Sequence, residues 1–148
     1  MSHLAAFDIH YIANRSFSVI EIIEMYLSQG WNLNDYGHIS FRPLGDKDSY
    51  DWTTMELDQV KELYEIIRKK VKADEDPALV LMWDKTDVGA LTTFFPKEKR
   101  INFLLDVNRR IHPEVPDWTD MSWYLAPILK PLLTNKVIVE QIEFSDMP

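Results

Sequence analysis

Two histidines, His10 and His38, are the first candidates for chemistry in this chain, because imidazole is the usual acid–base group near neutral pH. Both lie on the polar side of segments that alternate polar and apolar residues. If those segments were neighbouring strands, the two histidines and Arg42 would resemble the arrangement of a metal-free ribonuclease. The alternative is two solvated histidines on an open sheet face, and the spacing in sequence does not choose between these interpretations.

Carboxylate pairs give little support for a metal site. Asp84 and Asp87 lie in an expected hairpin turn, where Asp is favoured for turn geometry. Glu140 and Glu143 lie in an expected strand, where residues three apart point to opposite faces unless a bulge intervenes. The sequence contains no cysteine, no H-E-x-x-H, no EF-hand loop and no phosphate-binding glycine loop. We therefore expect no metal and no cofactor.

Motifs for nucleophilic catalysis are also absent. The chain has no G-x-S-x-G motif and no cysteine nucleophile. The basic cluster KEKR (97–100) lies in an expected turn, where solvation explains it. The sequence therefore predicts a protein that is not an enzyme.

The charge balance bears on the partner class. With 24 acidic and 16 basic side chains, the formal net charge is −8. This excess argues against nucleic acid, which is bound mainly through Lys and Arg, and against anionic membrane surfaces. An acidic surface suits a basic protein partner, whose approach it would accelerate. The alternative is that the charge serves solubility alone.

The expected location is the cytoplasm. No run of about 18 apolar residues is present, so we expect no transmembrane helix. The first residues lack a basic start followed by a long apolar stretch, so we expect no signal peptide. The absence of cysteine is compatible with a reducing compartment.

Acidic and aromatic residues gather in two segments, which we predict to bind a partner. The first is the loop GDKDSYDW (45–52), and the second is DWTDMSWYL (117–125). Tryptophan is enriched at binding hot spots, and the carboxylates would meet basic side chains. The predicted partner-binding residues are Asp46, Asp48, Asp51, Trp52, Asp117, Trp118 and Asp120.

Trp118 and Trp123 have different expected environments. A helical stripe of Met121, Tyr124, Leu125 and Ile128 would face the core. Trp118 then lies outside the stripe at the helix start, whereas Trp123 lies on its flank. We therefore expect Trp118 to be exposed and Trp123 to cover the edge of the core.

Alternating and periodic patterns predict nine elements. Strands are expected at 7–13, 36–43, 78–83, 89–95, 100–107 and 136–144, and helices at 18–30, 53–72 and 119–126. Ser18 with Glu21, and Thr53 with Glu56, have the spacing of capping boxes, and Trp52 with Leu57 that of a hydrophobic staple. A kink or a second short helix should follow at Pro127 and Pro131.

These elements predict a single α+β domain over residues 1–148, in the order β-α-β-α-β-β-β-α-β. It should be a two-layer sandwich with a mostly antiparallel sheet of about six strands and three helices. The segments between Ala78 and Val107 should form an antiparallel meander, since their connections are too short for crossovers. The cluster of Arg68, Lys69, Lys70 and Lys72 is interpreted as a device that complements the end of a helix dipole.

In format the chain resembles the immunity proteins of bacterial polymorphic toxin and contact-dependent growth inhibition systems. The segments that bear the likeness are GDKDSYDW, PDWTDMSWYL and the acidic tail VEQIEFSD. The resemblance implies a small cytoplasmic α+β protein that covers the active site of a basic toxin, often a nuclease. The alternatives are a small metal-free hydrolase or ribonuclease that uses His10 and His38, and a regulatory or structural subunit of a larger assembly. The sequence does not indicate the oligomeric state.

Overall fold

The computed structural model describes residues 3–12, 15–46 and 51–148. The chain is an α+β protein with an antiparallel sheet of eight strands and three helices in the described ranges. The elements run β1 (Leu4–Ile12), α1 (Val19–Leu27), β2 (Trp31–Asn32), β3 (His38–Phe41), β4 (Thr53–Glu56), α2 (Val60–Lys72), β5 (Ala78–Trp83), β6 (Gly89–Phe95), β7 (Arg100–Val107), α3 (Met121–Thr134) and β8 (Ile138–Met147).

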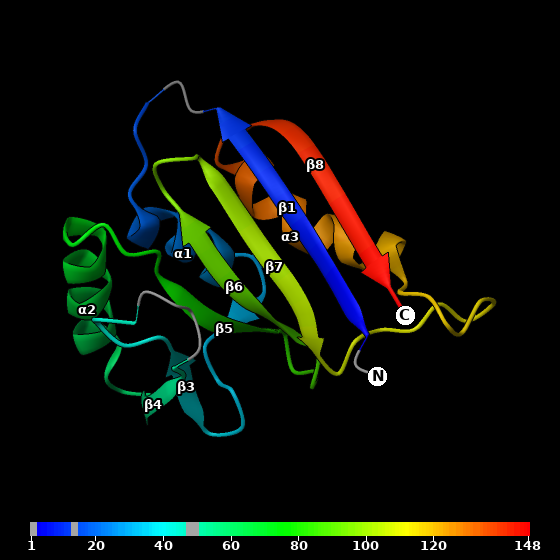
Figure 1. Ribbon diagram of the computed structural model, residues 1–148, viewed down its shortest axis with the longest axis horizontal. Helices are drawn as coiled ribbons and strands as arrows, with labels where there is room; N and C mark the ends of the chain where they lie inside the picture. The colour runs from blue at the N-terminus through cyan, green and yellow to red at the C-terminus, as the bar shows by residue number, and fades with distance from the viewer. Residues whose placement is uncertain (1–2, 13–14, 47–50) are drawn as a thin grey trace.

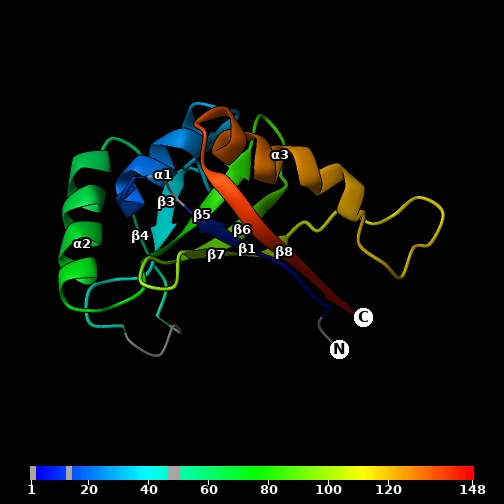
Figure 2. The same ribbon diagram turned by 90° about the horizontal axis from the view of Figure 1, so that it is seen from above.

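The sheet has the strand order β4-β3-β5-β6-β7-β1-β8, and β2 pairs with β5 beside this path. Figure 1 looks onto one face of the sheet, with α1 and α3 behind it and α2 beside the β3–β4 end. Figure 2 shows the same arrangement from above, with α1 and α3 on one side of the strands. The helices α1 and α3 therefore cover one face, and no helix of the described residues covers the other.

The predicted meander is confirmed. β5 pairs antiparallel with β6, and β6 pairs antiparallel with β7. β5 is apolar on both faces and lies inside the sheet between β3 and β6, with its first five residues buried. The sequence of β5 is apolar throughout because the strand is buried on both faces of the sheet.

The core lies between the sheet and the two covering helices. Strand β1 alternates as expected, with Phe7 and Ile9 fully buried. The predicted cap of α1 is also confirmed, because the Ser18 hydroxyl accepts from the Glu21 N–H and the Glu21 carboxylate accepts from the Ser18 N–H. This reciprocal pair satisfies two N–H groups at the helix start.

The expected start of the second helix is wrong. Residues Thr53–Glu56 form β4, which pairs with β3 in the register Phe41↔Thr53 to His38↔Glu56. Two adjacent β-branched threonines favour this extended backbone. Helix α2 begins at Val60, and Trp52 and Leu57 are both exposed rather than stapled. The two short strands β2 and β4 explain why the sheet exceeds the expected six strands.

The expected end of the last helix at Ala126, with a second short helix after it, is wrong. Helix α3 continues through Pro127 and Pro131. Pro131 has no N–H to donate to the carbonyl of Pro127, but the Trp31 indole N–H donates to that oxygen at 2.8 Å. The Tyr26 hydroxyl likewise donates to the Ile128 carbonyl at 2.6 Å. The hydrogen bond from Trp31 thus satisfies the Pro127 carbonyl, which Pro131 leaves without a helical donor.

The buried face of α3 is displaced from the expected stripe. Tyr124 and Ile128 are buried as predicted. Met121 and Leu125 are exposed, and Pro131 and Leu132 are buried instead. The displacement follows from the unbroken helix, whose last turns continue the same buried face.

Candidate protein-binding surface

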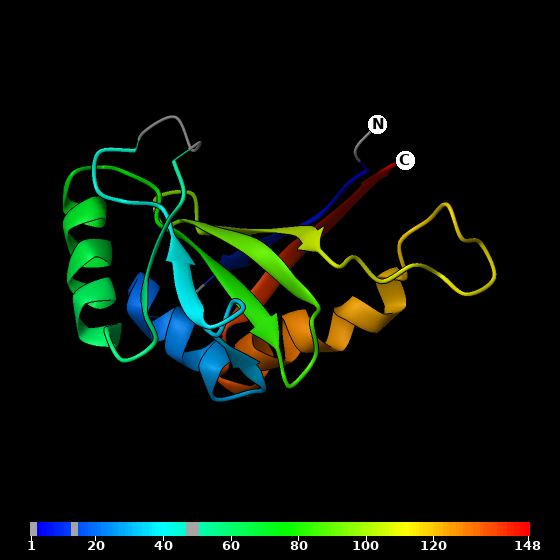
Figure 3. The ribbon, with the colours of Figure 1, turned by 90° about the horizontal axis from the view of Figure 1, so that it is seen from below.

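The segment between β7 and α3, residues 108–120, projects from one end of the sheet (Figures 1 and 3). Two backbone hydrogen bonds of 2.9 Å join its two limbs, one from His112 N–H to the Trp118 carbonyl and one from Asp120 N–H to the Arg110 carbonyl. An isolated antiparallel bridge pairs Ile111 with Thr119. The projecting loop is therefore folded on itself as a short hairpin.

Asp146 fastens the projecting loop to β8. Its carboxylate accepts from the Thr119 N–H at 2.7 Å and from the Thr119 hydroxyl at 2.9 Å, and it also contacts the His3 ring. Burial raises the pKa of Asp146, but the hydrogen bonds from His3 and Thr119 outweigh burial and lower the pKa below its usual value. The carboxylate is therefore a structural acceptor at neutral pH and not a free interface charge.

The projecting loop displays apolar side chains to solvent. Three side chains of the loop and one at the start of α3 are between 44% and 53% exposed: Ile111, Val115, Trp118 and Met121. The sequence-based expectation that Trp118 is exposed is confirmed. Apolar side chains gathered on a projecting, hydrogen-bonded loop are typical of a binding surface.

The exposed charged side chains on this loop are two carboxylates and the guanidinium of Arg110. Glu114 and Asp117 are exposed, and neither forms an ion pair within the described residues. The loop arginines are engaged locally, because Arg109 donates to the Thr119 hydroxyl at 2.9 Å and Arg110 lies 4.7 Å from the Trp123 ring centroid. We define the loop surface as Ile111, Glu114, Val115, Asp117, Trp118 and Met121.

Asp120 and Trp123 border this surface. Asp120 occupies the N-cap position of α3, and its carboxylate accepts from the Ser122 hydroxyl at 2.9 Å. Trp123 is half-buried, with its ring edge-on to Tyr124 at a centroid distance of 5.0 Å. Trp123 thus covers the edge of the core, as the sequence indicated.

The acidic loop GDKDSYDW (45–52) does not expose all of its predicted partner-binding residues. Asp46 is only 8% exposed, and one of its carboxylate oxygens accepts from the Asp51 N–H at 3.1 Å. Asp51 and Trp52 are exposed, and Arg42 lies 5.4 Å from the centroid of the Trp52 ring. Asp48 lies outside the described residues. Because Asp46 is buried, it helps to shape the loop and does not offer its charge to a partner.

A buried ion pair fixes the base of the same loop. Lys70 is 1% exposed, and its ammonium group lies 3.0 Å from the Glu75 carboxylate and 2.7 Å from the Pro43 carbonyl. The same carboxylate oxygen accepts from Gly45 N–H at 2.8 Å. Lys70 lies in the last turn of α2, as the sequence-based interpretation expected, and it also joins α2 to the loop through this buried ion pair.

The two predicted binding segments do not form one surface. Asp46, Asp51 and Trp52 flank β3 and β4 at one edge of the sheet, whereas Asp117, Trp118 and Asp120 lie beside the other edge, near the end of β8 (Figure 1). A partner of ordinary size would contact one or the other. The projecting loop is the better candidate, because it combines exposed apolar side chains with two carboxylates that form no ion pair with any described residue.

Strand β8 adds a second feature to the loop side. It is the terminal strand of the sheet and is largely exposed along its ten residues. The pairing of β1 with β8 shifts register between His10 and Tyr11, so that Glu140 lies at an irregularity in the strand. A bulge and charged residues are common means of protecting an edge strand from unwanted pairing.

The sequence-based interpretation omitted part of the loop surface. Ile111 and Val115 were not singled out, because no periodic pattern assigns loop side chains to a face. A usable signal was present in HPEVPDW, where Pro113 and Pro116 flank an apolar residue that no expected element buries.

The structure does not bring His10 and His38 together. β1 and β3 are separated by β5, β6 and β7, which is four strand spacings, or roughly 19 Å. His10 instead lies 3.4 Å from the Glu143 carboxylate. The paired-histidine arrangement expected for a ribonuclease therefore does not form.

Arg100, the cross-strand neighbour of His10, is held by carboxylates. Its guanidinium lies 2.6 Å from Asp8 and 3.0 Å from Glu98. Burial lowers the pKa of Arg100, but the bonds to these two carboxylates outweigh burial and raise it. A phosphate group would have to displace both carboxylates to reach this cation.

Among the described residues, no three His, Asp or Glu side chains come together as a possible metal site. Asp84 and Asp87 lie in the β5–β6 turn, as expected from sequence. No helix in the described part of the chain has both the length and the hydropathy needed to span a bilayer.

Comparison of the chain with models of protein families, with curated proteins and with solved structures finds no match.

Proposed function

We propose that this chain is a non-catalytic binding protein, specifically an immunity protein that neutralises a basic toxin domain by covering its active site. The observation that supports this most strongly is the projecting loop, which holds Trp118 in solvent beside Asp117. A half-exposed tryptophan on a loop closed by its own hydrogen bonds has apolar surface that a partner could bury. Binding is the simplest use for such a side chain.

The loop is suited to binding because it is already ordered. Its limbs are bonded to each other, and Thr119 is bonded to Asp146. A pre-ordered loop loses little conformational entropy on binding, so more of the contact energy appears as affinity. Trp118 would enter the cleft of the partner and displace water from it.

The carboxylates of the loop surface provide the electrostatic part of the mechanism. A nuclease keeps Lys and Arg side chains in its active site to hold phosphate. Glu114 and Asp117 would take the place of phosphate oxygens at such cations, and the net charge of −8 would accelerate the encounter. The toxin is then blocked by occupation of its active site, without any chemical step.

The proposal expects a neighbouring gene to encode a protein with a basic, toxin-like domain, and the test uses that protein. That protein should lose its activity when the purified chain is added in equal amount, and cells that express both should grow. The double variant Trp118→Ala/Asp117→Lys should fail to protect. The matched control Trp52→Ala/Asp51→Lys changes the same residue types at the opposite edge of the sheet and should protect normally.

Two outcomes would contradict the proposal. A complex that forms without loss of the partner's activity would favour the regulatory-subunit alternative. Hydrolysis of nucleic acid or of esters by the purified chain itself, lost in His10→Ala, would favour the catalytic alternative. We favour binding over catalysis because His10 and His38 lie on strands that are separated by three other strands.

A further inference from the structure

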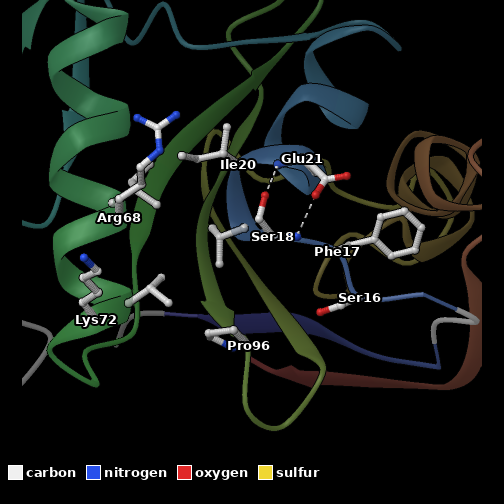
Figure 4. A pocket seen from close by; sticks show the side chains of 11 residues that line it. Ser16, Phe17, Ser18, Ile20, Glu21, Arg68, Lys72 and Pro96 are labelled. Atoms are coloured by element: carbon white, nitrogen blue, oxygen red, sulfur yellow. Dashed lines mark hydrogen bonds between the residues drawn. The ribbon is translucent and has the colours of Figure 1, made fainter.

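A separate feature lies on the other side of the molecule, where α1 and α2 diverge. The helices are linked through Tyr64 on α2, whose hydroxyl donates to the Glu24 carboxylate of α1 at 2.8 Å. Burial, the hydrogen bond and the charge of Glu24 together raise the pKa of Tyr64, which keeps its hydroxyl protonated as the donor. Beyond this contact, the first turn of α1 and the last turns of α2 enclose a groove (Figure 4).

The groove has a volume of about 810 Å³ and is open to solvent. Its apolar lining comes from three elements: Phe17 before α1, Val19 and Ile20 on α1, Ile67 and Val71 on α2, and Pro96 in the β6–β7 turn. Val19 and Ile67 are buried and form the floor, whereas Val71 is exposed. The volume falls within the range of small-molecule sites.

One wall of the groove is cationic. Arg68 and Lys72 lie on α2, and both line the groove (Figure 4). Arg68 is paired with Glu65 at 2.9 Å, but Lys72 has no ion pair within the described residues. The chain as a whole has a net charge of −8, but the charge beside this apolar groove is positive because of Lys72. The groove therefore favours an anion.

The acidic residue in the groove is already engaged. Glu21 accepts from the Ser18 N–H at 3.2 Å and is paired with Arg15 at 3.0 Å. These bonds lower the pKa of Glu21, the Ser18 N–H bond first and the Arg15 bond next, so that it stays ionised. Arg15 compensates the charge of Glu21. The cations on α2 therefore determine which sign of ligand charge the groove prefers.

We propose that this groove binds a small amphiphilic anion, with an apolar chain or ring against Ile20, Val71 and Pro96 and a carboxylate or sulfonate head at Lys72. The apolar body accounts for the lining, and the single charged head matches the single unpaired cation. This inference is independent of the proposed function, because the groove involves no residue of the loop surface.

The test uses two defined probes, 8-anilinonaphthalene-1-sulfonate and decanoate. The purified chain should bind the first with a rise in its fluorescence, and decanoate should displace it. Amide shifts in the NMR spectrum should concentrate in residues 16–21 and 67–72. Decanol, which has the same chain without the charge, should compete at least about tenfold more weakly, which corresponds to about 1.4 kcal/mol.

Two matched variants locate the charge. Lys72→Glu should weaken probe binding by about tenfold or more. Lys69→Glu makes the same charge change on the same exposed end of α2, but Lys69 does not line the groove. Its effect should stay within about twofold, and the thermal melts of both variants should match that of the unmodified chain.

The proposal is overturned if the probes do not bind, if the amide shifts fall outside the groove, or if decanol competes as well as decanoate. Equal effects of Lys69→Glu and Lys72→Glu would also overturn it, because they would show only the long-range field of the helix. Probe binding at the loop surface around Trp118 would count against the groove in the same way.

Discussion

Asp146 accepts two hydrogen bonds from Thr119, one from the backbone N–H at 2.7 Å and one from the hydroxyl at 2.9 Å. These bonds connect residues 27 positions apart and join the projecting loop to the terminal strand β8. The loop surface therefore has a defined orientation relative to the sheet. This orientation depends on the Asp146 carboxylate, which is not itself part of the loop surface.

The first prediction concerns Asp146→Asn. The variant keeps the shape of the side chain but replaces one acceptor oxygen with a donor, and the buried Thr119 N–H or hydroxyl loses its partner. The free energy of unfolding should fall by about 1–3 kcal/mol at neutral pH, as measured by denaturant titration. The exposed control Asp117→Asn should change it by less than about 0.5 kcal/mol.

The same contact has a predictable pH dependence. The folded-state pKa of Asp146 lies below its usual value of 3.8, so its contribution to stability is fully present above that value. The contribution is lost as the pH falls through the lowered folded-state pKa. The stability gap between Asp146→Asn and the unmodified chain should therefore narrow in that acidic range. A gap that stayed constant down to the lowest pH at which the chain folds would contradict the assignment.

The second prediction separates the two tryptophans of the last helix region. Trp118→Ala should leave the melting temperature within a few degrees, because the ring is 47% exposed. Trp123→Ala should cost about 1–3 kcal/mol of stability, less than a fully buried tryptophan, because the ring is half-buried on Tyr124 and beside Arg110.

Iodide quenching of the fluorescence provides an independent check. Trp118→Phe should remove a strongly quenched component of the emission, and Trp123→Phe a weakly quenched one. If the two variants lost components of equal accessibility, the assignment of Trp118 as the exposed residue would fail.

The third prediction concerns the buried pair Lys70 and Glu75. Removing one partner leaves an uncompensated charge beside Pro43 and Gly45, so Lys70→Met or Glu75→Gln alone should cost about 3–5 kcal/mol. The double variant should cost clearly less than the sum of the two. Additive costs in this double-mutant cycle would mean that the two side chains do not interact.

The fourth prediction concerns His10. Its ring lies on the uncovered face of the sheet beside Glu143, with no second histidine on a neighbouring strand. His10→Ala should leave the inhibition of the toxin unchanged and should abolish no hydrolytic activity. Assays of the purified chain on RNA, DNA and a simple ester provide the measurement.

The sequence predicted the regular parts of this fold well, because local pattern and tertiary packing agree there. The meander from β5 to β7 follows from alternation and short turns. Helix α1 follows from its capping box. At these positions every local preference matches the final environment, as expected for a chain that folds to one structure.

Other parts depended on contacts that are distant in sequence. Pro127 and Pro131 predict an interruption, and only the hydrogen bond from Trp31 shows how one freed carbonyl is satisfied inside a continuous helix. Asp46 looked like an interface charge until its bond to Asp51 and its burial were known. A buried side chain and an exposed one can lie in the same local sequence pattern, because tertiary structure determines which of them is buried.

The binding surface was predicted in part for the same reason. Trp118 was correctly expected in solvent, since it lies before the first turn of its helix. Ile111 and Val115 belong to the same surface only because the loop folds back on itself through the Ile111–Thr119 bridge. A hairpin of this kind has no periodic sequence pattern from which its exposed side could be predicted.

The most direct test of the proposed function is the affinity of the chain for the basic toxin domain that the proposal expects a neighbouring gene to encode, measured by calorimetry from about 0.05 to about 0.5 M salt. Affinity should fall as salt rises. Trp118→Ala should cost about 2 kcal/mol or more of binding free energy, and Trp52→Ala less than about 0.5 kcal/mol. No complex, an affinity that is independent of salt, or a larger loss in Trp52→Ala than in Trp118→Ala would contradict the account.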